Sequence, residues 1–265
     1  MLLKDKTVVI FGGSGAIGSA TALAMANEGA QIFLAARQAD KLEKAADRVR
    51  AAGGIVDILP LNVLDGAQTT AQVARLAQQI GGIDVVVNAT GFMHDQGKTL
   101  EQLSLSEYRQ GFEPFLNAQF TIAQAVAPWM GGERAGVIIT TIPPSATMAV
   151  PGHLGHIVGC AGMEAFIKAL ASELGAKHIR VLGVRSHAIA DAVSAGSYTA
   201  EVFAPKAQAL EISVEQWLGG AAHSTMLQRL PTLSQVAGII TFLASEQAAA
   251  MTATVVNVTA GATLS

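Results

Sequence analysis

The segment Phe11-Gly12-Gly13-Ser14-Gly15-Ala16-Ile17-Gly18 decides the fold of this chain. It follows Thr7–Phe11, a short apolar run rich in β-branched residues, and it precedes a helical pattern. Within it Gly13, Gly15 and Gly18 fit the pattern G-x-G-x-x-G. Glycine suits these places because the turn needs positive φ, the backbone must approach a diphosphate, and the helix must pack on the strand. The segment therefore predicts a dinucleotide site, with a merely tight turn as the alternative.

Apolar runs and amphipathic runs alternate along the rest of the chain. Strands are predicted at Thr7–Phe11, 31–35, 55–61, 84–88, 136–141, 179–185 and Thr254–Val258. Helices are predicted at 16–28, 41–52, 67–79, 106–130, 155–175 and 234–243. Strands separated by helices of this length form right-handed βαβ units with a parallel sheet. We therefore predict an α/β fold, a doubly wound parallel sheet of Rossmann type with three layers (α/β/α), as a single domain over residues 1–265.

Composition narrows the class of protein. Of the 265 residues, 51% are hydrophobic and only 14% are charged, which suits a sheet covered on both faces and suggests burial in an oligomer. The net charge of −3 provides no basic field for nucleic acid or an anionic membrane. The single cysteine, Cys160, excludes an internal disulfide and a cysteine-cluster zinc site, and it is compatible with a cytoplasmic protein.

No targeting or membrane-spanning segment is predicted. Met1-Leu2-Leu3 is followed at once by charged residues, unlike a signal peptide. Residues 135–163 carry no Asp, Glu, Lys or Arg and are long enough to span a bilayer. Because Pro143, Pro144 and Pro151 interrupt them, we predict a strand, a loop and the start of a helix there instead.

Arg37 bears on the choice of cofactor. It ends the second strand, about 20 residues after the glycines, where NAD-binding sheets carry an acid for the ribose 2′-hydroxyl. Ala36 leaves that acidic position empty, and an arginine here accommodates a 2′-phosphate. We therefore predict NADP(H) in preference to NAD(H). A plain solvated charge at Arg37 is the alternative.

Several further segments resemble the short-chain dehydrogenase/reductase family over essentially the whole chain. Leu61-Asn62-Val63 resembles its segment beside the adenine, and Asn88-Ala89-Thr90-Gly91 resembles its Asn-Asn-Ala-Gly turn. Residues 124–130 and 169–174 resemble its two core helices, and 242–258 its closing elements. The resemblance implies hydride transfer between a nicotinamide cofactor and a carbonyl or alcohol. It implies cofactor contacts at Gly12, Ser14, Gly15, Ala16, Ile17, Arg37, Asn62, Val63, Asn88, Ala89 and Thr90.

The resemblance also implies a homo-oligomer, a tetramer or a dimer. Its interfaces would be the helices at 106–130 and 155–175 and the C-terminal region.

The catalytic positions of that family hold other residue types here. Members carry Tyr-x-x-x-Lys on the helix that opens near Gly155, with both side chains on one face. The lysine holds the nicotinamide ribose and lowers the pKa of the tyrosine, and a serine and an asparagine assist. Counting back from 169–174 places His156 at the tyrosine, Cys160 at the lysine and Pro143 at the serine, and Phe115 falls at the asparagine. No Tyr-x-x-x-Lys occurs anywhere in the sequence.

Histidines are the remaining candidates for proton transfer. With a reference pKa of about 6.5, His156 is suited to act as an acid at neutral pH; a structural histidine is the alternative. His94 and His153 could line the same crevice. No metal site is predicted, because no carboxylate or cysteine is suitably spaced from His153 and His156. For Cys160 we predict a small buried apolar residue.

Residues 188–230 fall where the family keeps its substrate loop and small covering helices. They are mostly apolar, which predicts either a lid over an apolar carbonyl or alcohol ligand or a lid packed permanently shut. Three functions therefore remain open: an NADP(H)-preferring oxidoreductase of atypical mechanism, a non-catalytic relative that binds a nucleotide or apolar ligand, and a scaffold without cofactor.

Overall fold

The computed structural model describes residues 1–94, 97–148 and 150–264. Its centre is one parallel sheet in the order β3-β2-β1-β4-β5-β6-β7. The strands are β1 (Thr7–Phe11), β2 (Gln31–Ala36), β3 (Ile55–Pro60), β4 (Val85–Asn88), β5 (Gly136–Ile142), β6 (Ile179–Ser186) and β7 (Thr254–Val258). The predicted doubly wound sheet is confirmed, and each predicted strand agrees within one residue at either end.

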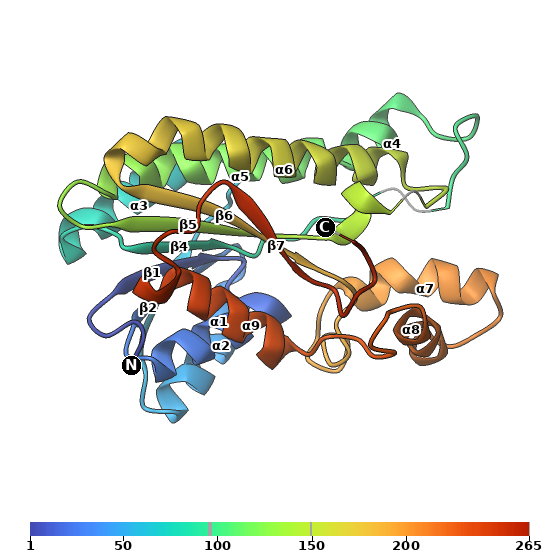
Figure 1. Ribbon diagram of the computed structural model, residues 1–265, viewed down its shortest axis with the longest axis horizontal. Helices are drawn as coiled ribbons and strands as arrows, with labels where there is room; N and C mark the ends of the chain where they lie inside the picture. Colours follow the sequence, from blue (N-terminus) through green and yellow to red (C-terminus); the bar gives the residue numbers. More distant parts are fainter. Residues whose placement is uncertain (95–96, 149, 265) are drawn as a thin grey trace.

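Helices cover both faces of the sheet. On one face lie α3 (Gly66–Ile80), α5 (Glu113–Val126) and α6 (Leu154–Leu174), and on the other lie α1 (Ala16–Asn27), α2 (Ala39–Ala51) and α9 (Leu233–Ala244) (Figure 1). Shorter elements are α4 (Leu105–Gln110), α7 (Thr199–Ala209), α8 (Val214–His223) and the 3-10 turns η1 (Ala127–Trp129), η2 (Pro144–Thr147), η3 (Gly175–Lys177) and η4 (Glu246–Ala248). The predicted helical run at 106–130 is α4, α5 and η1, interrupted between Gln110 and Glu113.

Two apolar cores lie on opposite faces of the sheet. In β1, Val8 and Ile10 contribute to the core under α1, α2 and α9, whereas Val9 and Phe11 contribute to the core under α3, α5 and α6. Successive side chains of a strand point to opposite faces, so a strand buried on both sides is apolar throughout. This explains why all of Thr7–Phe11 is buried.

The strand order creates a crevice at one end of the sheet. The chain runs outward from β1 to β3 and then returns to place β4 on the other side of β1. The connections after β1 and β4 therefore diverge past their carboxyl ends, where ligands of such sheets bind. Helices α7 and α8 lie at this same end, outside the layer formed by α1 and α9 (Figure 1).

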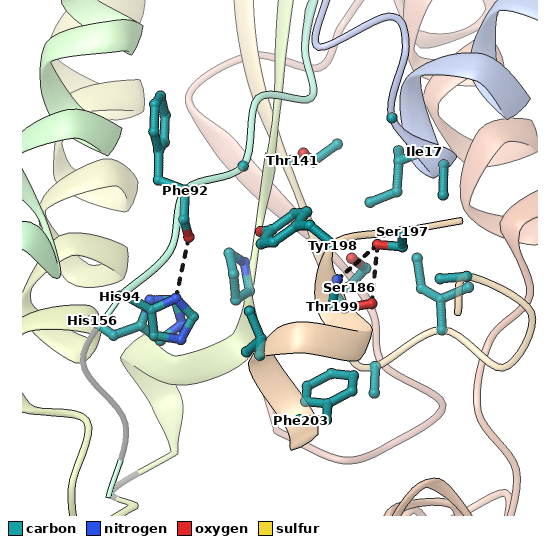
Figure 2. A pocket seen from close by; sticks show the side chains of 18 of the residues that line it. Ile17, Phe92, His94, Thr141, His156, Ser186, Ser197, Tyr198, Thr199 and Phe203 are labelled. Carbon is teal, nitrogen blue, oxygen red and sulfur yellow. Dashed lines mark hydrogen bonds between the residues drawn. The ribbon is translucent and has the colours of Figure 1, made fainter. Parts of the chain in front are cut away.

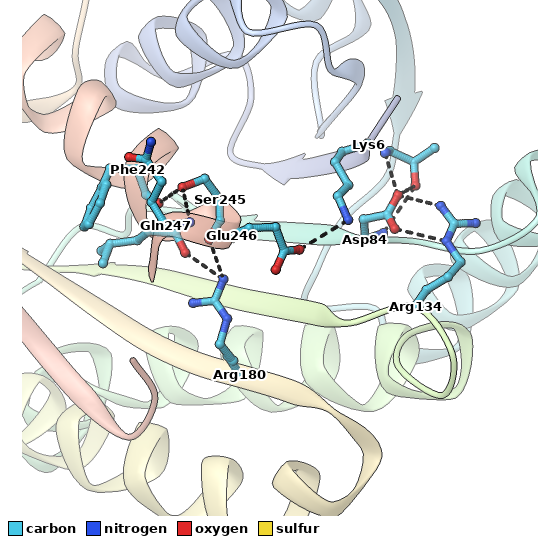
Figure 3. A network of polar contacts seen from close by, with 10 residues as sticks. Lys6, Asp84, Arg134, Arg180, Phe242, Ser245, Glu246 and Gln247 are labelled. Atoms are coloured by element: carbon cyan, nitrogen blue, oxygen red, sulfur yellow. Dashed lines mark hydrogen bonds and ion pairs between the residues drawn. The ribbon is translucent and has the colours of Figure 1, made fainter. Parts of the chain in front are cut away.

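The opposite end of the sheet is fastened by buried polar contacts (Figure 3). The Asp84 carboxylate, 3% exposed, accepts hydrogen bonds from the Thr7 N–H (2.8 Å) and hydroxyl (2.9 Å). It also accepts from Nε (3.0 Å) and Nη2 (2.6 Å) of Arg134. Arg180 in β6 donates to the carbonyl oxygens of Leu243 (2.9 Å) and Ser245 (3.3 Å). These contacts join β1, β4 and β6 to their neighbouring loops on the side away from the crevice.

One helical segment, Leu154–Lys177, is long and apolar enough to cross a bilayer by length and composition alone, with mean hydropathy 1.3. Its inward-facing residues, among them Cys160, Met163 and Ile167, belong to the core under α3, α5 and α6. Packing against the sheet accounts for much of its apolar character.

Candidate functional site

A cavity of about 830 Å³ extends along the carboxyl ends of the strands, from Arg37 and Lys41 at one end to α7 and α8 at the other. Ten of the eleven predicted cofactor residues line it. They are Gly12, Ser14, Gly15, Ala16, Ile17, Arg37, Asn62, Val63, Ala89 and Thr90. The same cavity contains three of the four family catalytic positions, namely Phe115, Pro143 and His156.

The glycine turn has the close packing that its sequence predicts, with one shift in detail. Gly12 adopts φ +76°, and a Cβ there would lie 2.4 Å from the carbonyl oxygen of Ala89. A Cβ on Gly18 would lie 2.3 Å from the carbonyl oxygen of Gly12. The left-handed residue is therefore Gly12, whereas the matched motif begins at Gly13. Gly13 instead packs under Leu34, 2.9 Å from where its Cβ would be.

The first amides of α1 are available to a ligand. Gly15 is the N-cap residue of this helix, and no side chain caps it. Among the described residues, the N–H groups of Ser14, Ala16 and Ile17 have no backbone acceptor, and all three residues line the cavity. Unpaired N–H groups and the positive end of the helix dipole bind phosphate. The turn is therefore a fitting cradle for a diphosphate.

Two cations lie together at the outer end of the cavity. Arg37 follows β2, Lys41 lies in the first turns of α2, and both line the cavity. Ala36, the last residue of β2, provides no acid that could bind a ribose 2′-hydroxyl. Lys41 escaped prediction because a charged residue on an amphipathic helix is ordinarily a solvated one.

Asn88 is the predicted cofactor residue that does not line the cavity. Its side chain is 1% exposed and donates from Nδ2 to Oε1 of Gln119 (2.7 Å). Its Oδ1 accepts from the N–H (3.0 Å) and hydroxyl (2.6 Å) of Thr90. Asn88 therefore shapes the turn that carries Ala89 and Thr90, which contact the cavity in its place.

Cys160, at the position of the family's lysine, does not line the cavity. Cys160 is fully buried, and burial raises the pKa of its thiol to about 12, with a hydrogen bond from Ser145 offsetting a part. The thiol lies 3.8 Å from Nε2 of His156. The predicted small buried residue is thus found. Phe115 and Pro143 have no side-chain proton to exchange.

His156 lies in the cavity wall, stacked on His94 (Figure 2). The ring centroids are 3.7 Å apart and the ring planes differ by 10°. Burial, and then the nearby charges of His94, His153 and Lys206, lower the pKa of His156 to about 3. Its imidazole is therefore neutral at pH 7, which favours the structural alternative over an imidazolium acid. No group of three or more His, Cys, Asp or Glu among the described residues is arranged to hold a metal ion.

Tyr198 and His187 are further cavity residues that the sequence did not single out. Tyr198, just before α7, packs its ring against Gly91, where a Cβ would lie 2.4 Å from the phenol oxygen (Figure 2). Burial raises the pKa of this phenol, so it is protonated at neutral pH. His187, just after β6, has a buried Nε2 with no hydrogen-bond partner among the described residues. Neither lies in a periodic pattern that could have marked it.

Fold and site together define a class. A doubly wound parallel sheet with a glycine turn and open helix amides at its switch point is the dinucleotide-binding arrangement of the Rossmann type. A family model described as "Enoyl-(Acyl carrier protein) reductase" matches residues 13–263. The chain belongs to the short-chain dehydrogenase/reductase family.

Individual relatives match along their whole length. The chain is 28% identical to the 3-oxoacyl-(acyl-carrier-protein) reductase FabG of Thermotoga maritima, covering 98% of this chain and 99% of the relative. It is 30% identical to the reductase of that name from Pseudomonas aeruginosa, covering 98% of each. It is 27% identical to the 2,3-dihydro-2,3-dihydroxybenzoate dehydrogenase of Bacillus subtilis, covering 99% of this chain and 97% of the relative.

Solved structures agree on the fold. A short-chain dehydrogenase/reductase from Serratia marcescens superimposes with a TM-score of 0.84 at 22% identity, covering 100% of both chains. A short-chain type dehydrogenase/reductase from Mycobacterium marinum gives a TM-score of 0.81 at 25% identity, covering 99% of this chain and 97% of that one.

Proposed function

We propose that this protein binds NADP(H) in preference to NAD(H) and transfers hydride between it and an apolar carbonyl compound or alcohol. The observation that carries the proposal is the continuity of one cavity from the Arg37 end, past the open amides of α1, to the apolar lid region. Reductase and dehydrogenase names among full-length relatives support the reaction class.

The residues present fit such a cofactor. Ser14, Ala16 and Ile17 would hold the diphosphate through their N–H groups, and Arg37 with Lys41 would hold a 2′-phosphate. Asn62 and Val63 would lie beside the adenine. The buried Nε2 of His187 has no hydrogen-bond partner among the described residues, and His187 lines the cavity. This supports a polar ligand group beside it, because buried polar atoms are normally hydrogen-bonded. When bound, the nicotinamide supplies the hydride, and the protein supplies position and electrostatics.

The proton that accompanies hydride transfer needs a source other than the family's tyrosine. His156 is the candidate acid that the sequence offers, but with its pKa lowered to about 3 the ring is neutral at pH 7 and only its weakly acidic N–H could supply a proton. This observation favours a second candidate function, a relative that binds cofactor or an apolar ligand without turnover. Where the second candidate binds the cofactor, the two share the nucleotide site and differ only in turnover.

Arg37→Ala tests the cofactor preference. Since hydrogen bonds to charged groups contribute about 1.5–3 kcal/mol, NADPH should bind roughly ten- to a hundredfold more weakly, with NADH binding nearly unchanged. Isothermal titration of both nucleotides measures this. Arg109→Ala, which removes an exposed arginine on α4 outside the cavity lining, is the control. Equal weakening of both nucleotides would contradict a 2′-phosphate contact, and tighter NADH binding by the wild type would contradict the preference.

Turnover separates the two candidate functions. NADPH oxidation should be followed with a broad panel of ketones and aldehydes, for the wild type and for His156→Ala. If His156 is the acid, the variant should lose roughly a hundredfold or more in rate while still binding NADPH. Turnover unaffected by the substitution removes His156 from the mechanism. Tight NADPH binding with no turnover of any compound supports the non-catalytic candidate.

We also propose a cytoplasmic homo-oligomer, a tetramer or a dimer, assembled through α5, α6 and the C-terminal region. Exposed apolar side chains on α5 and α6 support this interface, since Phe120 is 54% exposed and Leu154 is 45% exposed. Residues 188–230 are proposed as the lid, because α7 and α8 contribute the wall of the cavity opposite the glycine turn.

A further inference from the structure

The charged side chains that line the cavity are all basic. They are Arg37, Lys41 and Lys206, and the described lining residues include no aspartate or glutamate. Arg37 and Lys41 lie at the outer end, where the proposed cofactor accounts for them. Lys206 lies in α7 within the lid region, and nothing in the proposed cofactor site uses it. Lys206 is therefore a cationic group without an assigned ligand at the inner end of the cavity, the end formed by α7 and α8.

Lys206 is placed where an ammonium group is costly without a counter-charge. It is half-buried, and burial lowers its pKa. Within the described part of the chain, none of the ion pairs includes it. After burial and the charges of His94 and His153, the Lys206 charge also contributes to the lowered pKa of His156, which lines the same cavity. A ligand anion would offset its desolvation, because a buried charge is stabilised by an ionic partner.

The surroundings of Lys206 are apolar and aromatic. Phe203, one helical turn earlier on α7, stacks on Trp217 of α8 with ring centroids 4.3 Å apart and an angle of 27°. Phe203 is drawn among the cavity side chains in Figure 2. Leu210 and Ile212 line the cavity between the two helices. A ligand here would combine an apolar body with one negative group.

We infer that Lys206 recognises a carboxylate on the substrate, so that the substrate class is an apolar carbonyl compound or alcohol bearing an acid group. This inference rests on the proposed function, because it assigns the substrate of the same cavity. A carboxylate fits better than a phosphate monoester, because one ammonium group balances the single charge of a carboxylate. A phosphate monoester carries a charge of about −1.5 to −2 at pH 7, and no arginine among the described lining residues of this end would balance the rest.

The experiment uses two probes of matched apolar chain, decanoate and decanamide, titrated calorimetrically into the full-length protein with and without saturating NADP+. Decanoate should bind wild type at least tenfold more tightly than decanamide. Lys206→Met should abolish that preference by weakening decanoate about tenfold, and Lys206→Arg should retain it. Lys168→Met, which removes an exposed lysine of α6 outside the cavity lining, should match wild type.

Three results would overturn the inference: equal binding of the two probes by wild type, equal weakening of both by Lys206→Met, or no decanoate binding up to its solubility limit. Circular dichroism confirms that each variant is folded. NADPH titration of the same samples keeps the tests apart. A wild type that binds decanoate selectively but not NADPH refutes the cofactor proposal alone, whereas NADPH binding without decanoate selectivity refutes the carboxylate inference alone.

Discussion

Replacing Asp84 with alanine should lower the free energy of unfolding by about 2–4 kcal/mol, since it leaves the buried N–H of Thr7 without its acceptor and removes the charged partner of Arg134. The carboxylate holds the N–H and hydroxyl of Thr7 and both prongs of Arg134 at 2.6–3.0 Å (Figure 3). Arg134 is half-exposed and can turn to water. The buried N–H of Thr7 cannot, whereas the Thr7 hydroxyl keeps a second acceptor in the carbonyl oxygen of Gly82 (3.0 Å).

Urea unfolding followed by circular dichroism measures the effect. Glu43→Ala is the matched control, because it also removes a carboxylate bonded to an arginine, Arg50, but on the exposed face of α2. Its unfolding midpoint should stay at the wild-type value. An Asp84→Ala protein as stable as wild type would show that β1 and β4 are not held together by this carboxylate.

Replacing Gly12 with alanine should reduce NADPH affinity by about a hundredfold or more and also destabilise the fold. The φ of +76° costs an L-residue about 1–2 kcal/mol. Beyond that, the new Cβ would lie 2.4 Å from the carbonyl oxygen of Ala89 and 2.8 Å from the nitrogen of Thr90. Both are backbone atoms, so the turn after β4 must move, and it forms one wall of the proposed cofactor site.

Gly53→Ala separates conformational strain from collision. Gly53 has φ +82°, close to that of Gly12, but a Cβ there has nothing within 4 Å. Gly53→Ala should therefore show the conformational cost alone, a small fall in melting temperature, with NADPH affinity unchanged. Calorimetric titration and thermal unfolding of both variants test this. If both variants bind NADPH as wild type does, the close approach at Gly12 is not needed for the site.

The sequence predicts the fold well because its signals are local and repeated. The valine run of β4 and the β-branched run of β1 are buried on both faces, and so each reads as an unbroken apolar segment. The boundary that the pattern missed is inside 106–130. The residue types on both sides of Gly111 and Phe112 favour a helix, so the pattern predicts one continuous run. In the structure α4 ends at Gln110, and a new helix, α5, begins at Glu113 with a proline in its first turn.

The site is only partly predictable because side-chain direction depends on tertiary contacts. Asn88 was expected to face the cofactor, but its amide donates to Gln119 of α5, whose side-chain oxygen also accepts from Thr140 of β5, and this draws the amide inward. Tyr198 and Lys206 lie in a stretch without clear periodicity, and only the packing of α7 over the crevice brings them to the cavity. In the sequence, nothing about this tyrosine or this lysine distinguished a cavity position from a surface position.

The stack of Phe203 on Trp217 gives the protein a natural optical probe. The chain has two tryptophans, and the other, Trp129, lies in η1. Its carbonyl oxygen accepts from the N–H of Ile83, two residues before β4 and away from the crevice. Indole emission is sensitive to nearby polarity and is absorbed by reduced nicotinamide. Ligand-induced quenching of tryptophan fluorescence that disappears in Trp217→Phe but persists in Trp129→Phe would therefore report that the inner end of the cavity is occupied, without any attached label.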